Sequence, residues 1–159
     1  MHKRLNNKGF TIVEVLIVLA IAGAILAAVL IAVPALQRSG RNSTARTAAQ
    51  QLVSGVQEYE QANGGSAPTG MTPSAGSAQW NGAVGTQPVT STISGTITPS
   101  SVSSGVVAAP GQGKVVAYIG YLCNSSNSGA SSSGATANNI AIIYPIENGG
   151  ATVMGCIQA

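Results

Sequence analysis

Few residues in this 159-residue chain could carry out acid–base or metal chemistry. The chain has four glutamates and no aspartate, and its single histidine is His2. General acid–base catalysis needs a titratable side chain held against a reacting group, and metal sites need several ligands together. We find no nucleophile motif, phosphate-binding loop or metal-ligand spacing. The sequence therefore predicts a structural protein that is not an enzyme and that has no cofactor and no metal.

One glutamate, Glu14, has an unusual position. It lies within KGFTIVEVLIVL (residues 8–19) and is the only charged residue between Lys8 and Arg38. Because a buried carboxylate without a partner is costly, such a group is usually neutralised or paired. Two interpretations follow from the residues alone. Glu14 is either tolerated near a bilayer interface, or it pairs with a cation that this stretch of sequence does not supply.

A long apolar segment follows Glu14. Val15 to Val33 gives nineteen residues without charge, which as a helix extend about 28 Å, enough to cross a bilayer. Three interpretations are open: a single-pass anchor, a secretory signal peptide cleaved near VPA (33–35), or a more specialised membrane helix. The apolar run is about twice the ~7–15 residues of a signal-peptide core, which argues against the second.

The charges near this segment suggest its orientation and its partners. Three of the seven cations lie in the first nine residues, so the remaining four match the four glutamates. The leading cations favour an N-terminus on the cytoplasmic side. Arginines also follow the segment, namely Arg38, Arg41 and Arg46. A chain that is neutral beyond residue 9 argues against a nucleic-acid partner, because such binders are strongly basic.

The beginning of the chain closely resembles the N-terminus of bacterial type IV pilins of the IVa branch. The matching stretch is NKGFTIVEVLIVLAIAGAILAAV, residues 7–29. Lys8-Gly9, the aromatic Phe10, Thr11, Glu14 and the uninterrupted apolar run carry the resemblance. Beyond about residue 60 the chain resembles no particular member of that family.

The resemblance implies a role for Glu14. In type IV pilins a membrane-embedded peptidase cuts after the glycine and methylates the new amine, which here places the cut between Gly9 and Phe10 and the methyl group on Phe10. The cut creates a cation, since a terminal amine has a pKa of ~8. In an assembled filament the family's carboxylate is thought to meet the terminal amine of a neighbouring subunit. The resemblance therefore implies that Glu14 sets the register between helices.

Two residues weaken the apolar helix. Gly23 adds backbone freedom, and Pro34 removes one backbone donor. Many pilins carry a proline slightly nearer the N-terminus, where this chain has Ile31. We expect a continuous helix in the membrane-held subunit and a helix break between Gly23 and Pro34 in a filament.

The following segment, residues 37–63, predicts an amphipathic helix that stops at the NGG of residues 63–65. At 100° per residue, one arc contains the apolar stripe: Ala45, Ala48, Ala49, Leu52, Val53, Val56 and Tyr59. Extending this stripe backward meets Arg41 and Arg38, so we expect a packed domain to cover the helix only from Ala45 onward. The arginines are expected to contact lipid head groups or the filament interior; contact with DNA during uptake is the less favoured alternative.

The remaining residues, 64–159, predict a small antiparallel sheet. Segments 114–123, 139–146 and 151–157 are rich in β-branched and aromatic residues, and the ENGG between the last two predicts a hairpin. Pro145 should restrict its strand to an edge or a bulge.

A weaker strand is predicted over residues 88–99, where Gly and Ser reduce the β-propensity. Residues 124–139 form a low-complexity, Ser-rich stretch, and residues 64–82 are rich in Gly and Pro. Both are expected to be mostly loop.

Cys123 and Cys156 are the only cysteines. Both end predicted strands in the exported part of the chain, where disulfides persist. Type IV pilins often have a disulfide-bounded loop near the C-terminus, and the resemblance implies that these two cysteines form it. Two buried free thiols are the alternative.

Together these features predict an α+β protein of the pilin kind, in which a long N-terminal helix packs on a small antiparallel sheet. Its expected parts are a leader (1–9), a transmembrane and filament-core helix (10–36), an amphipathic continuation (37–63) and a Ser/Thr/Gly-rich head (64–159). The expected function is a type IV pilus subunit, first held as a single-pass protein in the inner or cytoplasmic membrane and then exposed on the cell surface.

The expected partners are other copies of the chain, a prepilin peptidase, the pilus assembly machinery, and a host cell or other surface during adhesion or twitching motility. Two alternatives remain: a pseudopilin of a type II secretion or DNA-uptake system, and a membrane-anchored surface domain without an assembly role. Major secretion pseudopilins tend to bind calcium through C-terminal carboxylates, and Glu147 is the only acid beyond Glu60, which disfavours that alternative.

Overall fold

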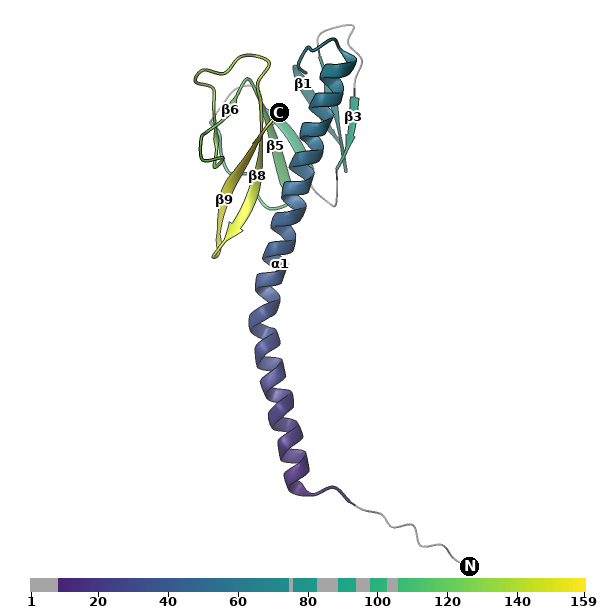
Figure 1. Cartoon of the computed structure of the whole chain (residues 1–159), viewed down its shortest axis with the longest axis vertical. Coiled ribbons are helices and arrows are strands. Elements are labelled where there is room, and N and C mark those ends of the chain that lie inside the picture. Colours follow the sequence, from purple (N-terminus) through teal and green to yellow (C-terminus); the bar gives the residue numbers. More distant parts are fainter. Residues whose placement is uncertain (1–8, 75, 83–88, 94–97, 103–105) are drawn as a thin grey trace, which may run out of the picture. The chain divides into compact units, whose positions relative to one another are not determined.

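The computed structural model describes residues 9–74, 76–82, 89–93, 98–102 and 106–159. The chain divides into two compact units, residues 1–38 and residues 39–159. Within the described residues, one helix, α1 (Ile12–Ala62), precedes the strands β1 to β9 (Figure 1). The α+β class that the sequence predicts is confirmed.

Helix α1 is unbroken from Ile12 to Ala62, with Pro34 inside it. Its end has the geometry of a glycine-capped helix, because the Gly65 N–H donates to the Glu60 carbonyl at 2.7 Å and Gly64 has a φ of +66°. Glycine adopts this conformation without the Cβ clash of other residues. The predicted stop at residues 63–65 is confirmed, and the unbroken helix is the form expected of a membrane-held subunit.

The first unit exposes an apolar helix surface. Its large apolar side chains are all exposed: Phe10, Ile12, Val13, Val15, Leu16, Ile17, Val18, Leu19, Ile21, Ile25, Leu26, Val29, Leu30, Ile31, Val33 and Leu36. By length and composition this helix can cross a membrane. Burying so continuous an apolar surface, in lipid or against protein, is strongly favourable.

The second unit has its core between α1 and the strands. The buried helix residues are Ala45, Ala48, Ala49, Leu52, Gly55, Val56 and Tyr59. They pack with Trp80, Val115 and Ile142, which are fully buried. The predicted apolar stripe is confirmed except at Val53, which is only half-buried. Burial begins at Ala45, as the arginines on the same face predict.

Two main sheets form this unit, and Figure 1 shows them on either side of the later part of α1. The three-stranded sheet has the order β1 (Gly70–Ser74), β2 (Ser77–Asn81), β3 (Val89–Thr92). The four-stranded sheet has the order β4 (Thr98–Val102), β5 (Lys114–Ile119), β8 (Ile140–Asn148), β9 (Ala151–Gln158). A short pair, β6 (Leu122–Cys123) with β7 (Ala130–Ser131), completes the described strands.

The β8–β9 hairpin is confirmed. Its register runs from Ala141 opposite Gln158 to Asn148 opposite Ala151, and both turn glycines, Gly149 and Gly150, have positive φ. Pro145 was expected at an edge or a bulge, but β8 is an inner strand. The proline is tolerated because β5 pairs only with residues 140–143 of β8, so Pro145 lies beyond that ladder.

Three strand predictions are wrong. Residues 64–82 were expected to be mostly loop, yet they contain β1 and β2, in which Ser74 lies opposite Ser77 and Gly76 has a φ of +70°. The Pro73 that disfavoured a strand lies on β1, an edge strand, where a missing donor is harmless. The expected strand over 88–99 is instead two strands in different sheets, β3 and β4; residues 88 and 94–97 lie outside the described residues.

The third error concerns residues 114–123, where Gly120, at φ +79°, separates β5 from β6. The sheet is also not purely antiparallel, since β4 pairs with β5 in parallel. The loop predicted over 124–139 contains only the two-residue strand β7. It otherwise consists of turns and irregular backbone.

Candidate functional site

The start of α1 is a capping box formed by Thr11 and Glu14. The Thr11 backbone N–H and hydroxyl donate to Glu14 Oε2 at 2.9 and 2.7 Å, and the Glu14 N–H donates to the Thr11 hydroxyl at 3.3 Å. This reciprocal pair satisfies donors that a helix start leaves free, and the carboxylate is favoured by the positive end of the helix dipole. Thr-x-x-Glu before an apolar run is the sequence signature of such a box, and it was the signal from which this pair could have been predicted.

Both bonds from Thr11 end on the same carboxylate oxygen of Glu14. Among the described residues, Glu14 Oε1 accepts no hydrogen bond. A carboxylate has about four lone-pair sites, so it can cap its own helix and accept from a second donor at once. The side chain is therefore oriented by the chain itself, with one oxygen free for a partner.

Gly9 and Phe10 lie next to this carboxylate and outside the helix. Both are exposed, and the backbone at these residues has no regular structure. Phe10 and Glu14 line one hollow of about 280 Å³ together with Val15, Val18 and Leu19. Because an exposed peptide bond outside regular structure is accessible to a peptidase, cleavage at Gly9–Phe10, immediately before the capping box, is sterically open.

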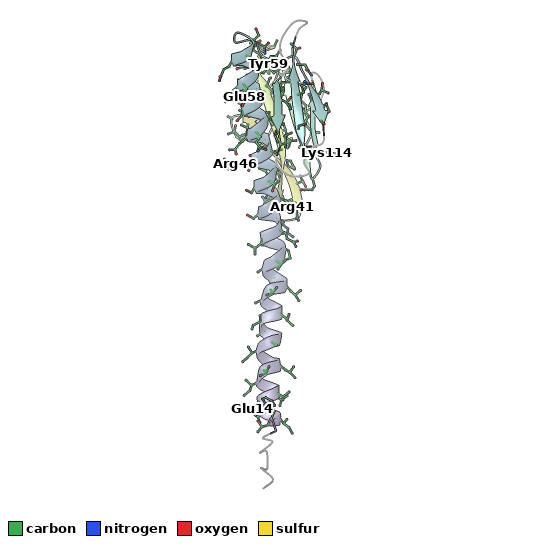
Figure 2. The ribbon with its side chains drawn as sticks, turned by 90° about the vertical axis from the view of Figure 1, so that its right-hand side faces the viewer. Glu14, Arg41, Arg46, Glu58, Tyr59 and Lys114 are labelled. Carbon is green, nitrogen blue, oxygen red and sulfur yellow. A yellow bond between two sulfur atoms is a disulfide. The ribbon has the colours of Figure 1, made fainter. Side chains whose placement is uncertain are left out.

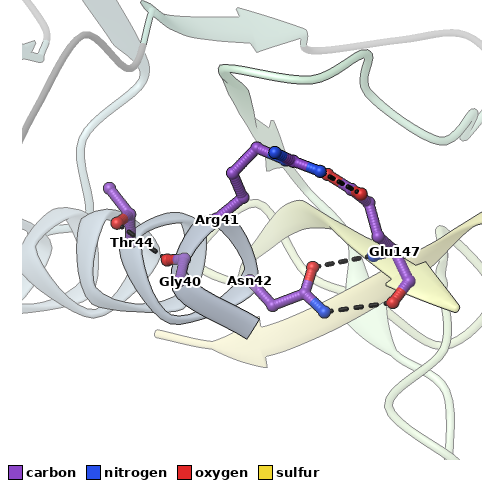
Figure 3. A network of polar contacts seen from close by, with 5 residues as sticks. All are labelled: Gly40, Arg41, Asn42, Thr44 and Glu147. Carbon is purple, nitrogen blue, oxygen red and sulfur yellow. Dashed lines mark hydrogen bonds and ion pairs between the residues drawn. The ribbon is translucent and has the colours of Figure 1, made fainter. Parts of the chain in front are cut away.

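In the second unit, Arg41 on α1 binds Glu147 at the end of β8 (Figure 3). Arg41 Nε donates to Glu147 Oε1 at 2.5 Å, and Arg41 Nη2 donates to Oε2 at 2.7 Å. This is the two-pronged geometry that a guanidinium and a carboxylate favour. The bond to Glu147 raises the pKa of Arg41 above its usual value. Arg41 thus has a partner within its own chain, and the expected lipid or filament contact of the arginines stays a prediction.

Asn42 holds the backbone of the same residue. Its side-chain Nδ2 donates to the Glu147 carbonyl at 3.1 Å, and its Oδ1 accepts from the Glu147 N–H at 2.7 Å. One amide side chain thus satisfies both backbone groups of a strand residue, as a neighbouring strand would. We call Arg41, Asn42 and Glu147 the hairpin contact. Sequence reasoning missed it because the partners are more than 100 residues apart.

The two cysteines form a disulfide between β6 and β9. Cys123 and Cys156 have Cα atoms 5.8 Å apart, and each has a further backbone restraint. The Cys156 N–H donates to the Asn127 carbonyl, and the Cys123 N–H donates to the side chain of Gln158, both at 2.8 Å. The covalent bond therefore ties β6, and the loop of residues 124–139 that follows it, to β9, the edge strand of the four-stranded sheet.

The other sequence-predicted residues are separate from these groups. Gly23 and Pro34 lie inside α1 of the first unit, and no Cβ added at Gly23 would meet another atom. Among the described residues, no group of three His, Cys, Asp or Glu side chains lies together as a metal site would require.

The structure thus combines an exposed apolar helix that is long enough to cross a membrane, a capped carboxylate at the start of that helix and a small α+β unit. The family model for the prokaryotic N-terminal methylation motif matches residues 4–30, and this motif is the signature of type IV pilin-like prepilins. No curated protein and no solved structure matches the chain. The match supports a type IV pilin-like or pseudopilin-like subunit, which is a structural and not an enzymatic class.

The matched motif also carries consequences for processing and location. It implies a membrane-anchored precursor, processing by a prepilin peptidase and assembly into a multi-subunit filament.

Proposed function

We propose that this chain is the structural subunit of a type IV pilus filament on the cell surface. The observation that supports it best is the carboxylate of Glu14, which is held one turn after the exposed Gly9–Phe10 bond at the start of an apolar helix. A plain membrane anchor has no use for a charge at this position, because a carboxylate there only weakens insertion.

The proposed assembly step begins with cleavage between Gly9 and Phe10. Cleavage gives Phe10 a terminal amine, methylated and positively charged near neutral pH. Glu14 Oε1 then accepts from the Phe10 amine of a neighbouring subunit, while Oε2 continues to cap its own helix. In an apolar filament core an unpaired charge is costly. Only the register that pairs amine with carboxylate is then favourable, and the subunits add in that register.

Glu147 supports a pilus subunit over a calcium-binding secretion pseudopilin. It is the only acid in the head beyond Glu60, and both of its carboxylate oxygens accept from Arg41. A calcium site needs several oxygen ligands together. The head therefore has no carboxylate to offer such a site without breaking the hairpin contact.

Cleavage is tested by the intact mass of the protein isolated from the cell surface. We expect a chain that begins at Phe10 and carries one methyl group. A chain that begins at Leu36, after the VPA of residues 33–35, would establish an ordinary secretory signal and contradict the proposal.

The filament itself is tested by electron microscopy of cells that lack the chain and of cells complemented with it. We expect surface filaments to disappear and to return, with loss and recovery of surface adhesion or twitching motility. Filaments unchanged by the deletion, together with lost protein secretion or DNA uptake, would assign the chain to the pseudopilins instead.

A further inference from the structure

Two exposed charges of opposite sign lie on α1 of the second unit, and the fold of the unit does not use them. Arg46 and Glu58 both lie on α1 and are exposed. Within the part of the chain that the structure describes, neither takes part in an ion pair, whereas Arg41 is paired with Glu147. In Figure 2 both side chains lie on the side of the helix that faces away from the sheets.

Arg46 and Glu58 lie on different flanks of that outward side. They are twelve residues apart, which places them about 120° apart around the helix and about 18 Å apart along it. Each flank is adjacent to a different sheet, because Arg46 shares a groove with Tyr144 and Ile146 of β8, whereas Glu58 shares one with Thr90 and Thr92 of β3. Figure 1 shows β8 and β3 on opposite sides of α1.

The two grooves are similar in size and complementary in chemistry. The Arg46 groove has a volume of about 360 Å³ and also includes Ser39, Asn42 and Ser43. The Glu58 groove has a volume of about 290 Å³ and also includes Gln51, Ser54 and Gly55. Each has hydroxyl and amide groups around a single charge, positive in one and negative in the other, and the Arg46 groove also has the apolar surface of Tyr144 and Ile146.

We propose that the Arg46 groove of one copy of this chain binds the Glu58 groove of the next copy. The two surfaces are different patches of the same molecule, so the contact is head-to-tail and does not close on itself in a pair. Such a heterologous contact produces a ring or an open helical array. This inference rests on the proposed function, since a filament is the assembly in which every copy uses both grooves.

The remaining charges of the unit do not compete at these positions. Glu60 lies two residues from Glu58, which places it about 160° away around the helix, and it is not among the residues that line the Glu58 groove. Lys114 begins β5, and Figure 2 shows it on the far side of the unit from the outward face of α1.

A single exposed ion pair contributes little affinity but strongly disfavours a wrong partner of like charge. Repeated along a filament, with each subunit making the contact twice, it selects the register between heads. The contact is therefore expected to affect filament number and stability more than the folding of one subunit.

Charge reversal tests the contact directly. Arg46→Glu and Glu58→Arg should each lower the number of surface filaments at least tenfold, because each juxtaposes like charges. The double variant Arg46→Glu/Glu58→Arg restores the opposite pair and should recover at least half of the wild-type number. Lys114→Glu and Glu60→Lys are the matched controls and should keep wild-type numbers. Single variants with normal filaments, or a double variant no better than the singles, would overturn the proposal.

Cysteine cross-linking gives a readout that does not need surface filaments. Under mild oxidation, membranes with the double variant Arg46→Cys/Glu58→Cys should give a ladder of multimers on a non-reducing gel. Each single variant can give dimers at most. Absence of a ladder from the double variant would overturn the contact. Absence of filaments from wild-type cells would instead overturn the proposed function, so the two failures are distinguishable.

Discussion

The side-chain amide of Asn42 on α1 makes two hydrogen bonds to the backbone of Glu147 on β8. It accepts from the Glu147 N–H at 2.7 Å and donates to the Glu147 carbonyl at 3.1 Å. Both groups of Asn42 are thereby used where the β8–β9 hairpin approaches the helix. The neighbouring Arg41 adds two bonds to the carboxylate of the same residue. The hairpin contact thus fixes the position of one strand against the helix through a single residue.

The hairpin contact predicts that Asn42→Ala destabilises the second unit. The change removes both bonds that the Asn42 side chain makes to the partly buried backbone of Glu147, which costs about 1–3 kcal/mol. Arg41→Ala should cost less, because half of the Arg41 side chain is exposed and water replaces its bonds. Thermal unfolding of the detergent-solubilised full chain measures both, with the exposed Ser43→Ala as the control. A larger loss from Arg41→Ala than from Asn42→Ala would contradict this order.

The capping box allows the two roles of Glu14 to be separated. Glu14→Gln keeps an oxygen that can accept from the Thr11 N–H but removes the charge, whereas Thr11→Ala removes the cap and keeps the charge. If pairing with an amine drives assembly, Glu14→Gln and Glu14→Val give processed, membrane-bound protein and few or no filaments. Thr11→Ala should still assemble, with a cost of about 1 kcal/mol in helix stability. Filament counts by electron microscopy distinguish the two roles. Normal filament numbers with Glu14→Gln would show that the charge is dispensable for assembly.

We predict that any side chain added at Gly155 on β9 destabilises the second unit. A Cβ at this position would overlap the ring of Tyr144, which lies directly opposite in the β8–β9 register and is buried. Gly155→Ala must displace that ring, at a cost of about 1–3 kcal/mol for overpacking. Gly111→Ala is the matched control, because an added Cβ there meets nothing within 4 Å. Equal unfolding temperatures for the two variants would contradict the tight packing over Gly155.

Reduction of the Cys123–Cys156 disulfide should also destabilise the second unit. Its two cysteines are 33 residues apart, and closing a loop of that size contributes roughly 3–4 kcal/mol in the chain-entropy model. We expect non-reducing peptide mapping to recover the two cysteines as one linked species. Cys123→Ser/Cys156→Ser should lower the unfolding temperature, and recovery of both thiols free from surface protein would contradict the pairing.

The parts of this fold that the sequence predicts are those set by local pattern. The helix, its stop at residues 63–65, its buried stripe from Ala45 and the β8–β9 hairpin all follow from periodicity and turn residues that lie close together in the chain. The same holds for the methylation motif, which is carried by consecutive residues.

The parts that the sequence does not predict depend on distant partners. β1 and β2 contain few apolar residues, and only packing of Met71, Ala78 and Trp80 into the core makes them strands. Neither segment has a sequence pattern that predicts the parallel pairing of β4 with β5. The residues around Arg41 in the sequence do not distinguish a lipid contact from a bond to Glu147. Its partner depends on the position of β8 against the helix, which only the fold determines.

We predict that the helix between Gly23 and Pro34, which is continuous here, loosens when the chain is assembled in a filament. Pro34 cannot donate to the Leu30 carbonyl, so one helical hydrogen bond is missing, and Gly23 adds backbone freedom at the other end. In lipid every other backbone group of this segment needs its helical partner, which keeps the segment helical. In a filament, neighbouring subunits replace lipid, and their polar groups or ordered water can supply partners for backbone groups that leave the helix.

An extended residue rises about 3.3 Å, compared with about 1.5 Å in a helix. Loosening five residues would therefore lengthen each subunit by about 9 Å and let a filament stretch under load. Pro34→Ala restores the missing donor and should yield filaments that extend less in a force measurement, whereas Gly40→Ala, in α1 beyond this segment, should leave the extension unchanged. A filament reconstruction that resolves the backbone from Phe10 to Ala45 provides the direct check, and an unbroken helix through that span would exclude the loosening.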